Sequence, residues 1–467
     1  MKQRKIEDAL GEISPRHIAE AAGPVKKKRT SLPWIGAIAA VLALVLTVSF
    51  LKIPVAVEAG AVSLAQPRTD PRPDWEKYED MKQYDADIEA WLAREEAREA
   101  TAKEALQTMS GFFRESTGLF LAGEGNQLYS PINACIGLSM AAELTAGNTR
   151  QQLLDALGVS DIEALARYIS TLWEAAYYEN GKEVCTLASA LWLDDKVDFH
   201  QSAMDTLAHD YYVSVYRQDL QSSQALSDIQ DWLNSNTGGH LKDSVQNIQL
   251  PELAVLALYS TIYFQGKWAD EFQAAGNTPG PFHAPGGDVT ATYMKKLSQM
   301  QYHWGDSFGA VALGLKNGSR MWFILPDPDK TTADVLAEGQ YMDMILGEWE
   351  NSKYVKVNLS VPKFDIQATK DLREGLAEMG ITDMFQFGEA DFSSSLKVPA
   401  AFSAANQAVR VAIDETGVTA SAYIELPAAG TAPPPKEIID FILDRPFLFV
   451  IADYSGIPLF AGTVAQP

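Results

Sequence analysis

The chain has 467 residues, enough for one large domain or for two or three of ordinary size. Hydrophobic residues make up 47% and charged residues 21% of it, as is typical of globular proteins. The net charge of −23 at pH 7 argues against the basic surface that nucleic-acid binding needs, so no nucleic-acid partner is expected.

The first 29 residues are basic although the chain as a whole is acidic. Residues 1–29 contain eight Lys or Arg and four Asp or Glu, a net charge of +4. The cluster Lys26-Lys27-Lys28-Arg29 directly precedes a run without charge that extends to Leu51. Such a run can cross a bilayer as a helix, with its basic side in the cytoplasm. We therefore expect a cytoplasmic tail at 1–29 and a single transmembrane signal-anchor helix at 30–52, with the remainder outside the cell membrane.

Two other interpretations of residues 30–52 stay open at this point. A signal peptide cleaved at the motif Ala59-Gly60-Ala61 would make the protein secreted. A helix buried in a protein core is the second alternative. The long segment ahead of the apolar run favours the retained anchor, because a cleaved signal peptide has a short leader.

Residues 53–104 are expected to connect the membrane segment to a globular body. Prolines punctuate 60–73, which favours a spacer. From 74 to about 105 the chain is rich in Glu, Lys, Arg and Ala, with larger apolar residues at loosely helical spacing. This pattern predicts a charged helical stalk, solvated on most sides rather than built to bind a partner.

The body, at 105–467, begins with helices and ends mainly with strands. Helical spacing or capping signals occur at 105–121, 131–145, 149–158, 200–209, 228–243 and 372–385. Strand patterns occur at 126–131, 186–195, 211–220, 253–268, 282–296, 319–330 and 353–367, with a closing hairpin at 440–464. The predicted fold class is α+β with large sheets.

Two details of this body concern its interior. The run at 253–268 is apolar almost throughout, which predicts a strand buried on both faces. Cys135 and Cys185 both stand in apolar runs, where a free cysteine packs as a small core residue. Core packing is therefore expected for both, in preference to a disulfide.

Residues 411–435 begin with a strand pattern but end in prolines that a sheet cannot accommodate. Apolar residues alternate along it, at Val418, Ala420, Ala422, Ile424 and Leu426. The pattern follows a turn-like Glu415-Thr416-Gly417 and runs into Pro427 and the triple proline 433–435. Because proline donates no ladder hydrogen bond, a sheet cannot continue there. We expect a strand-like segment that ends in an open loop.

Catalytic and cofactor-binding motifs are absent from the sequence. It contains no GxSxG, no HExxH and no P-loop. The six histidines have no metal-ligand spacing, so neither a metal nor a cofactor is expected. A Ser-His-Asp set gathered from distant positions stays open, because its members need not be close in sequence. A hydrolase is nevertheless not favoured.

Residues 105–467 resemble the serpin family along nearly their whole length. The matching segments follow the family's order: NQLYSPINACIGLSMAAELTAGNTRQQLLDALG, ASALWLDD, IQDWLNSNTGGHLKD, YSTIYFQGKWADEF, VNLSVPKFDIQATKDLREGLAEMGITDMF, AIDETGVTASA and DRPFLFVIADYSGIPLFAGTV. The resemblance implies a fold of about three β-sheets surrounded by helices, with an exposed reactive-centre loop at about 415–440. With the predicted anchor, it points to a monomeric, membrane-anchored member similar to bacterial serpins.

The resemblance also implies a function: suicide inhibition of serine proteases, without enzyme activity. A protease cuts the loop, and the cut loop then inserts as a new strand into the large sheet and traps the acyl-enzyme. The hinge of this movement would comprise Glu415, Thr416, Gly417, Val418, Thr419, Ala420, Ser421 and Ala422. The inward-facing set contains no charge, so insertion would bury no unpaired ion.

The family's spacing from the hinge glycine implies which bond is cut. Counted from Gly417, it is Thr431–Ala432, with Ala429 and Gly430 as near alternatives. The neighbouring residues include no Arg, Lys or aromatic side chain, which suits a protease with a small primary pocket. The expected partner is an extracellular elastase-like or subtilisin-like serine protease.

The region that controls sheet opening departs from the family in two places. Ser260 and Gln407 stand where most serpins have Asn and His, and we expect them to hydrogen-bond with Ser130 and Asn133. Trp268 matches the family at the point where insertion starts.

Two loop residues also depart from the family pattern. Ile424 is larger than the usual residue at its place, and Pro427 would forfeit a ladder hydrogen bond after insertion. Both would slow insertion. They keep an alternative open, a non-inhibitory surface binding module with the same fold.

Overall fold

The computed structural model describes residues 61–65, 73, 77, 78, 80–179, 183–347, 349–418 and 437–467. The chain divides into two compact units, Met1–Ala56 and Val57–Pro467, and all described residues belong to the second. The expected cytoplasmic tail and transmembrane segment therefore lie outside the described residues. So do residues 419–436 of the expected loop.

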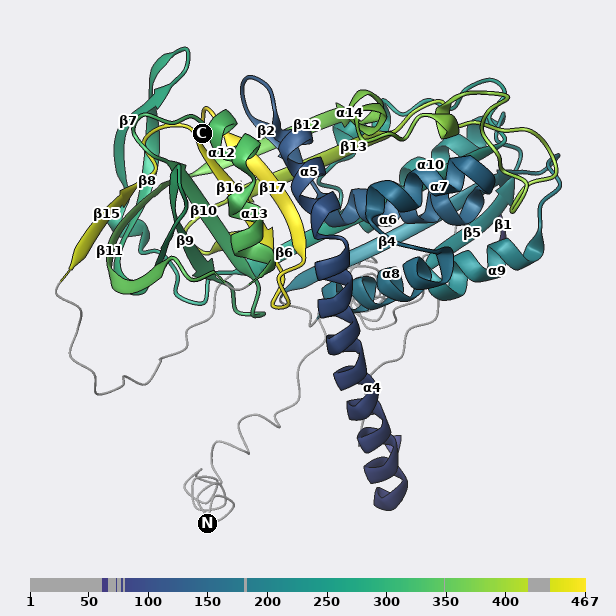
Figure 1. The fold of residues 1–467 in the computed structure, drawn as a ribbon, viewed down its shortest axis with the longest axis horizontal. Helices are drawn as coiled ribbons and strands as arrows, with labels where there is room; N and C mark the ends of the chain where they lie inside the picture. The colour runs from purple at the N-terminus through teal and green to yellow at the C-terminus, as the bar shows by residue number, and fades with distance from the viewer. Residues whose placement is uncertain are drawn as a thin grey trace, which may run out of the picture. The chain divides into compact units, whose positions relative to one another are not determined.

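Helices and strands alternate through the body before strands take over (Figure 1). The α-helices are α4 (Met81–Thr108), α5 (Ser110–Leu121), α6 (Pro131–Leu144), α7 (Gly147–Leu157), α8 (Ile162–Ala176), α9 (Gln201–Asp210), α10 (Ser223–Asn236), α11 (Lys242–Gln246), α12 (Thr332–Glu338), α13 (Gln340–Leu346) and α14 (Arg373–Glu378). Their ends follow ordinary capping rules. Ser222 accepts the N–H of Ala225 at the start of α10, and Gly158 ends α7 in the left-handed conformation that favours glycine.

The first three strands have two to four residues, and of the later ones only β14 is as short. They are β1 (Val62–Ala65), β2 (Gln127–Tyr129), β3 (Tyr178–Glu179), β4 (Val184–Asp194), β5 (Val213–Gln218), β6 (Leu256–Lys267), β7 (Thr278–Ala284), β8 (Gly287–Trp304), β9 (Phe308–Gly314), β10 (Arg320–Pro326), β11 (Ser352–Pro362), β12 (Phe364–Asp371), β13 (Asn406–Ile413), β14 (Gly417–Val418), β15 (Ile438–Ile442), β16 (Phe447–Ala452) and β17 (Pro458–Val464).

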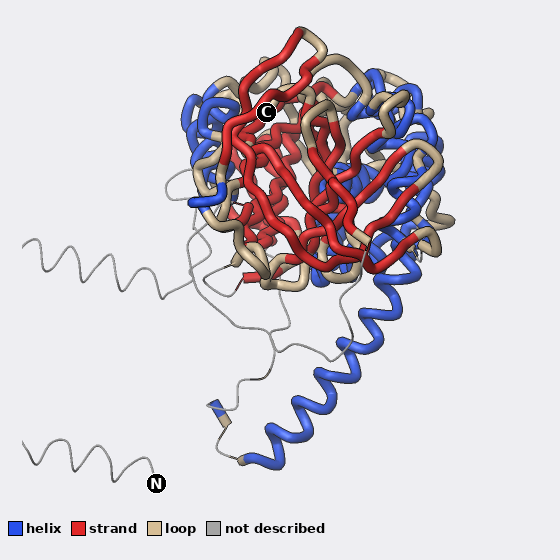
Figure 2. The backbone as a smooth tube through the Cα atoms, turned by 90° about the vertical axis from the view of Figure 1, so that its left-hand side faces the viewer, coloured by secondary structure: helices blue, strands red, loops and turns tan. Residues whose placement is uncertain are grey.

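The described strands form two sheets, with helices outside them (Figure 2). In the eight-stranded sheet the order is β1-β5-β4-β6-β14-β13-β12, with β3 beside β4. In the nine-stranded sheet it is β15-β11-β8-β9-β10-β16-β17-β2, with β7 beside β8. β8 is 18 residues long and pairs with β11 for most of its length and with β9 at its end. It thereby joins the second and third sheets of the expected fold into one, and the mixed α and β class is confirmed.

The expected helical stalk corresponds to α4, but this helix does not stop at residue 104. It continues to Thr108, and its last turns pack on α8, where Arg98 pairs with Glu174 at 2.5 Å and Tyr168 donates to Glu104 at 2.6 Å. The stalk is thus continuous with the body. In the described part of the chain, no helix is both long enough and apolar enough to cross a membrane.

Part of the expected spacer is a strand. β1 pairs antiparallel with β5 and so becomes the outermost strand of the eight-stranded sheet. Four residues, Val62 to Ala65, are too few to reveal a strand by periodicity. Their partner at Tyr216 to Arg217 is also about 150 residues distant in sequence.

The main core lies between the two sheets and the helices α5 to α8, and it includes Cys135 and Cys185, both free and buried. A separate cluster joins α10 to the outer face of the eight-stranded sheet, around Trp192. The prediction that the run at 253–268 is buried on both faces is wrong. Tyr259 and Tyr263 of β6 are only half-buried, and among the described residues β6 has on one side only the two-residue β14 as a strand neighbour.

Asp453 is a buried carboxylic acid at the turn between β16 and β17. Its Oδ1 accepts the backbone N–H groups of Ser455 at 2.9 Å and Ile457 at 2.7 Å. Burial raises the pKa of Asp453 to about 7, although these N–H groups act in the opposite direction. The folded protein therefore favours the protonated acid.

Because of Asp453, the free energy of unfolding should fall as the pH rises from about 4 to about 7. Below pH 4 both states bind the proton, and in this window only the folded state does. Asp453→Asn keeps an acceptor oxygen but does not titrate. The free energy of unfolding of this variant minus that of the parent should therefore increase by on the order of 2–4 kcal/mol as the pH rises from about 4 to about 7. Urea unfolding of both proteins at pH 5 and pH 8 measures this. Asp329→Asn on an exposed turn is the control, and a pH-independent difference between Asp453→Asn and the parent contradicts the prediction.

Candidate functional site

The chain reverses direction directly after β13. The Oδ1 atom of Asp414 accepts the N–H of Thr416 at 2.8 Å, the N–H of Gly417 at 3.2 Å and the hydroxyl of Thr416 at 2.6 Å. This is the side-chain-closed turn that aspartate favours. It returns the chain as β14, so that Val418 pairs with Ile413 of β13 on one side and with Gly266 of β6 on the other.

Gly417 allows the close approach of β14 to β6. A Cβ atom at this position would lie 2.2 Å from the carbonyl oxygen of Gly266, well inside van der Waals contact. The next residue, Val418, is 4% exposed and belongs to the main core. Gly417 of the hinge and Val418, the first residue of the strand pattern at 418–426, thus already occupy a strand position of the large sheet.

Trp268 and two loop segments hold the hinge in place. The indole Nε1 of Trp268 donates to the carbonyl of Asp414 at 2.8 Å, and its backbone N–H donates to Thr416 at 3.0 Å. Lys363 pairs with Glu415 at 2.5 Å, and Asn277 donates to the same carboxylate. Burial opposes ionisation of Glu415, but Lys363 and Asn277 hold its pKa below the ordinary value.

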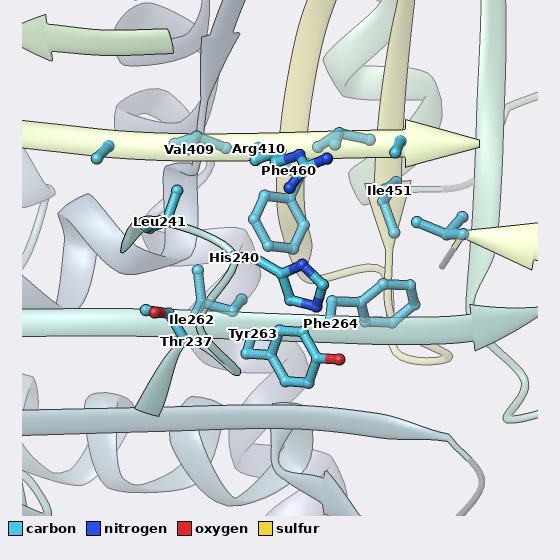
Figure 3. A pocket seen from close by; sticks show the side chains of 14 residues that line it. Thr237, His240, Leu241, Ile262, Tyr263, Phe264, Val409, Arg410, Ile451 and Phe460 are labelled. Atoms are coloured by element: carbon cyan, nitrogen blue, oxygen red, sulfur yellow. The ribbon is translucent and has the colours of Figure 1, made fainter. Parts of the chain in front are cut away.

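Beyond β14, a groove separates β6 from β13. It encloses a cavity of about 100 Å³ (Figure 3). Ile262, Tyr263 and Phe264 line it from β6, the run from Ala408 to Ala412 lines it from β13, Ile451 and Phe460 form its floor, and Thr237, His240 and Leu241 cover it. In the described chain, β6 and β13 have no direct pairing with each other.

A buried polar network closes the far end of the groove. Gln407 on β13 accepts the N–H of Ser130 at 2.8 Å and donates to its carbonyl at 3.0 Å. Gln407 also donates to Asn133 at 3.3 Å, and Asn133 donates to the hydroxyl of Ser260 on β6 at 3.0 Å. The start of α6 thereby bridges the two strands.

The structure brings the described site residues together in two groups. Glu415, Thr416, Gly417, Val418 and Trp268 meet at the hinge, and Ser130, Asn133, Ser260 and Gln407 meet at the far end. The expected hydrogen bonds of Ser260 and Gln407 are present. Thr419, Ala420, Ser421 and Ala422 of the hinge, and Ala429, Gly430, Thr431 and Ala432 around the expected reactive bond, lie outside the described residues.

Three residues of the site were missed by the sequence reasoning. Asp414 had a signal, since an aspartate that opens the run Asp-Glu-Thr-Gly favours a turn. Lys363 and Asn277 had none, because each lies at least 50 residues from Glu415 and reaches it only through the folded sheets.

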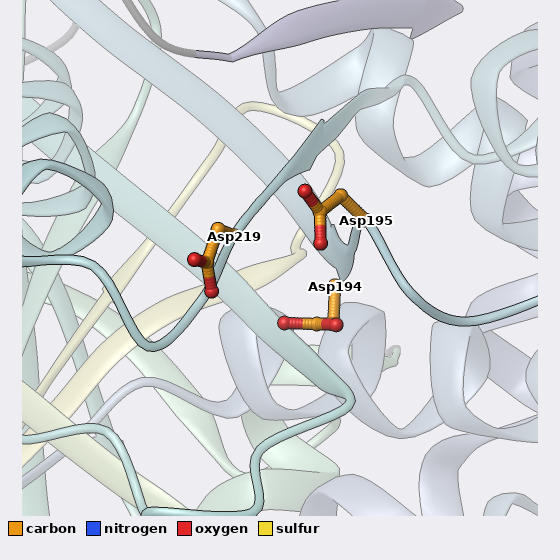
Figure 4. Close-up of side chains that lie close together, drawn as sticks. All are labelled: Asp194, Asp195 and Asp219. Carbon is orange, nitrogen blue, oxygen red and sulfur yellow. The ribbon is translucent and has the colours of Figure 1, made fainter.

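A separate group of acidic residues lies at the turns that follow β4 and β5. Oxygen atoms of Asp194, Asp195 and Asp219 lie within 4.8 Å of one another (Figure 4). Asp194 accepts the N–H groups of Lys196 at 3.0 Å and Leu220 at 3.1 Å, and the ammonium of Lys196 pairs with Asp219 at 3.1 Å. These bonds join the turn after β4 to the turn after β5, which gives the acidic cluster a structural role.

The eight-stranded sheet thus holds a two-residue strand, β14, at one end of a groove between β6 and β13. A family search matches residues 118–467 to "Serpin (serine protease inhibitor)". This match covers about three quarters of the chain, so the chain belongs to the serpin family, whose members are protease inhibitors and not enzymes.

Individual relatives are similar at low identity. The chain is 27% identical to plasminogen activator inhibitor 1 of Neovison vison over 354 residues, which cover 73% of this chain and 87% of that protein. It resembles the thermophilic serpin tengpin in the native state, with 23% identity and a TM-score of 0.70 over 88% of this chain and 100% of that chain. A complex of thyroxine-binding globulin with thyroxine gives 21% identity and a TM-score of 0.64, over 77% of this chain and 99% of that chain. At such identities the two structures show the fold alone.

Gly417→Ala should displace β14 from β6. The atoms nearest the added Cβ belong to the backbone of Gly266 and Lys267. Rotation of a side chain cannot relieve this clash, so β14 itself has to move. Trp268 bonds to the turn that precedes β14, so its fluorescence should shift to longer wavelength as water reaches it. Gly314→Ala is the matched control, because its nearest neighbour, the Cβ of Ala269, is 3.8 Å away. Equal spectra for Gly417→Ala and Gly314→Ala would contradict this account of the glycine.

Proposed function

We propose that this protein is an irreversible suicide-substrate inhibitor of serine proteases. The observation that supports it best is the position of Gly417 and Val418, paired between β6 and β13 at one end of an apolar groove. A segment that continues from Val418 along this groove would pair with a strand on each side. Neighbouring strands lie about 4.8 Å apart, so one more strand needs β6 and β13 to move apart over their remaining length.

The reaction starts as an ordinary proteolytic acyl transfer. The serine of the protease attacks the carbonyl carbon of Thr431, the bond to Ala432 breaks, and the new amine of Ala432 takes the proton. Thr431 is then held to the protease as an ester. Insertion of the segment that precedes Thr431 carries the ester away from the hinge before water hydrolyses it.

Apolar burial and new ladder bonds drive the insertion. Buried Ile424 and Leu426 contribute roughly 1.5–3 kcal/mol each, and each new ladder hydrogen bond contributes about 0.5–1.5 kcal/mol. A full strand flanked on both sides therefore releases on the order of 10 kcal/mol, comparable with the stability of a domain. Pro427 forfeits one ladder bond and slows the last step.

We further propose the target class and the location. The small residues around Thr431–Ala432 suit an elastase-like or subtilisin-like protease. The apolar segment 30–52 anchors a monomeric inhibitor at the cell surface, as in a membrane-bound relative of bacterial serpins, with secretion after signal cleavage as the alternative.

The second candidate function is a non-inhibitory binding module. Its support is that the fold is shared with thyroxine-binding globulin, whose structure was solved with thyroxine bound. Thermal unfolding after loop cleavage separates the two candidates. A large gain in thermal midpoint means that the cut loop inserts, and an unchanged midpoint favours the binding module.

The central test mixes the full-length chain, in detergent, with an elastase-type and a subtilisin-type protease. We expect a complex that survives SDS and contains both proteins, because the ester bond at Thr431 persists. Mass spectrometry of the released C-terminal peptide identifies the cut bond, which should precede Ala432. A loop that is cut without any SDS-stable complex would falsify the inhibitor proposal.

Ala420→Glu should convert the inhibitor into a substrate. Residue 420 belongs to the expected inward-facing set, and an unpaired carboxylate that insertion buries costs several kcal/mol. The loop should still be cut, but the trapped fraction on SDS gels should fall by about tenfold or more. Val398→Glu, on an exposed loop, is the control. Unchanged trapping by Ala420→Glu counts against insertion.

A further inference from the structure

The sheet formed by β8, β11 and β15 has one buried and one exposed face. On β11 the buried residues Val355 and Val357 alternate with Tyr354 and Lys356, so the latter two point to the opposite face. β15 is the outermost strand and pairs with β11. Figure 1 shows these three strands on the opposite side of the molecule from α7 and α9.

Four large apolar side chains are exposed on this face. They are 39% to 59% exposed and come from all three strands: Leu297, Tyr354, Ile438 and Ile442. The other large apolar residues that are exposed in the described chain are distributed over α4, β1 and several turns. Single exposed apolar residues are ordinary, but a group on one sheet face is typical of a binding surface.

The strand register brings these side chains together around Lys356. Ile438 stands directly beside Lys356 in the pair of β15 and β11. Tyr354 precedes Lys356 by two residues on the same face, and Leu297 is paired with the next residue of that face, Asn358. Asn358 donates to the carboxylate of Asp440 at 2.7 Å. We call Leu297, Tyr354, Lys356, Ile438 and Ile442 the outer face, an apolar patch with a positive charge at its centre.

The outer face begins close to the bond that the protease is expected to cut. The carboxylate of Glu437 pairs with Lys353 at 2.5 Å, and its carbonyl accepts the N–H of Lys356 at 3.2 Å. Glu437 is therefore a fixed point beside Ile438. Ala432 precedes Glu437 by five residues, which span at most about 18 Å when fully extended.

A protease that cuts Thr431–Ala432 therefore comes within reach of the outer face. A globular protease of about 250 residues is roughly 45 Å across, more than twice the distance that the five residues allow. Its surface beside the cleft, on the side that holds the residues after the cut bond, lies next to β15. The small side chains of the loop by themselves give little discrimination among proteases with a small pocket.

We propose that the outer face is an accessory docking surface for the target protease. It recognises apolar side chains and a carboxylate on the protease surface beside the cleft, the carboxylate opposite Lys356. The proposal rests on the proposed function and adds a second determinant of its specificity. The outer face acts before the bond is cut, so it changes the rate of cutting and leaves unchanged the fraction of cut molecules that trap the protease.

The test measures cutting of the full-length chain, in detergent, by an elastase-type and a subtilisin-type protease. Tyr354→Thr/Ile438→Thr removes two apolar contacts and keeps residues that suit a strand. With the protease that cuts the parent faster, release of the C-terminal peptide should slow by at least about tenfold. Lys356→Glu should slow it by about tenfold at low salt, and added salt should reduce the difference from the parent.

Met81→Ser/Leu92→Ser is the matched control, because it removes two exposed apolar residues from α4 and should leave the cutting rate unchanged. Equal cutting rates for the parent, Tyr354→Thr/Ile438→Thr and Lys356→Glu would overturn the docking proposal, as would an equal loss in the control. A parent dimer that Tyr354→Thr/Ile438→Thr cannot form would assign the outer face to a second copy and overturn it too. If the parent is cut but never trapped, the proposed function fails, and the cutting rates still decide the docking proposal.

Discussion

The incomplete ladder between β6 and β13 is the constraint on which the rest of this structure depends. Adjacent strands of a sheet usually share hydrogen bonds along their length, but among the described residues Gly417 and Val418 alone link β6 to β13 through strand pairing. The sheet is otherwise held across this line by side chains, with a charged pair and an indole at one end and a polar network at the other. Side-chain bonds of this kind can be exchanged one by one, whereas a full ladder would have to open as a unit.

The segments that cover the sheet beside the gap between β6 and β13 are attached with unequal firmness. α10 is fixed to the sheet by the ring of Trp232, which meets Trp192 of β4 edge-on, and Trp192 in turn contacts Tyr216 and Tyr259 on the neighbouring strands. The segment after α10 contacts the sheet through the ring of His240, and α11 contacts it through exposed hydrogen bonds of Ser244. The firmly attached helix α10 thus lies over β4 to β6, and the more weakly attached segment after it lies over the groove.

Features encoded by neighbouring residues could be predicted from the sequence. The turn that precedes β14 and the long strands follow from local patterns, and Trp268 could be assigned by family resemblance. Features that depend on remote partners could not. The partial exposure of β6 was missed because hydrophobicity does not reveal that, in the described chain, its neighbour on one side is a strand of two residues. Likewise, no local pattern indicates that Ser244 meets Thr369 across a groove.

The pairing of β1 with β5 has a consequence for association between molecules. An uncovered edge strand presents unpaired N–H and C=O groups that can template the addition of a strand from another chain. With β1 in place, Val215 to Arg217 of β5 are flanked on both sides, and the outermost position passes to a strand of four residues with a register shift between Ser63 and Ala65. Short, irregular edges are poor templates. A chain that began after Ala65 would instead expose β5, so the segment that precedes α4 also protects this sheet from aggregation.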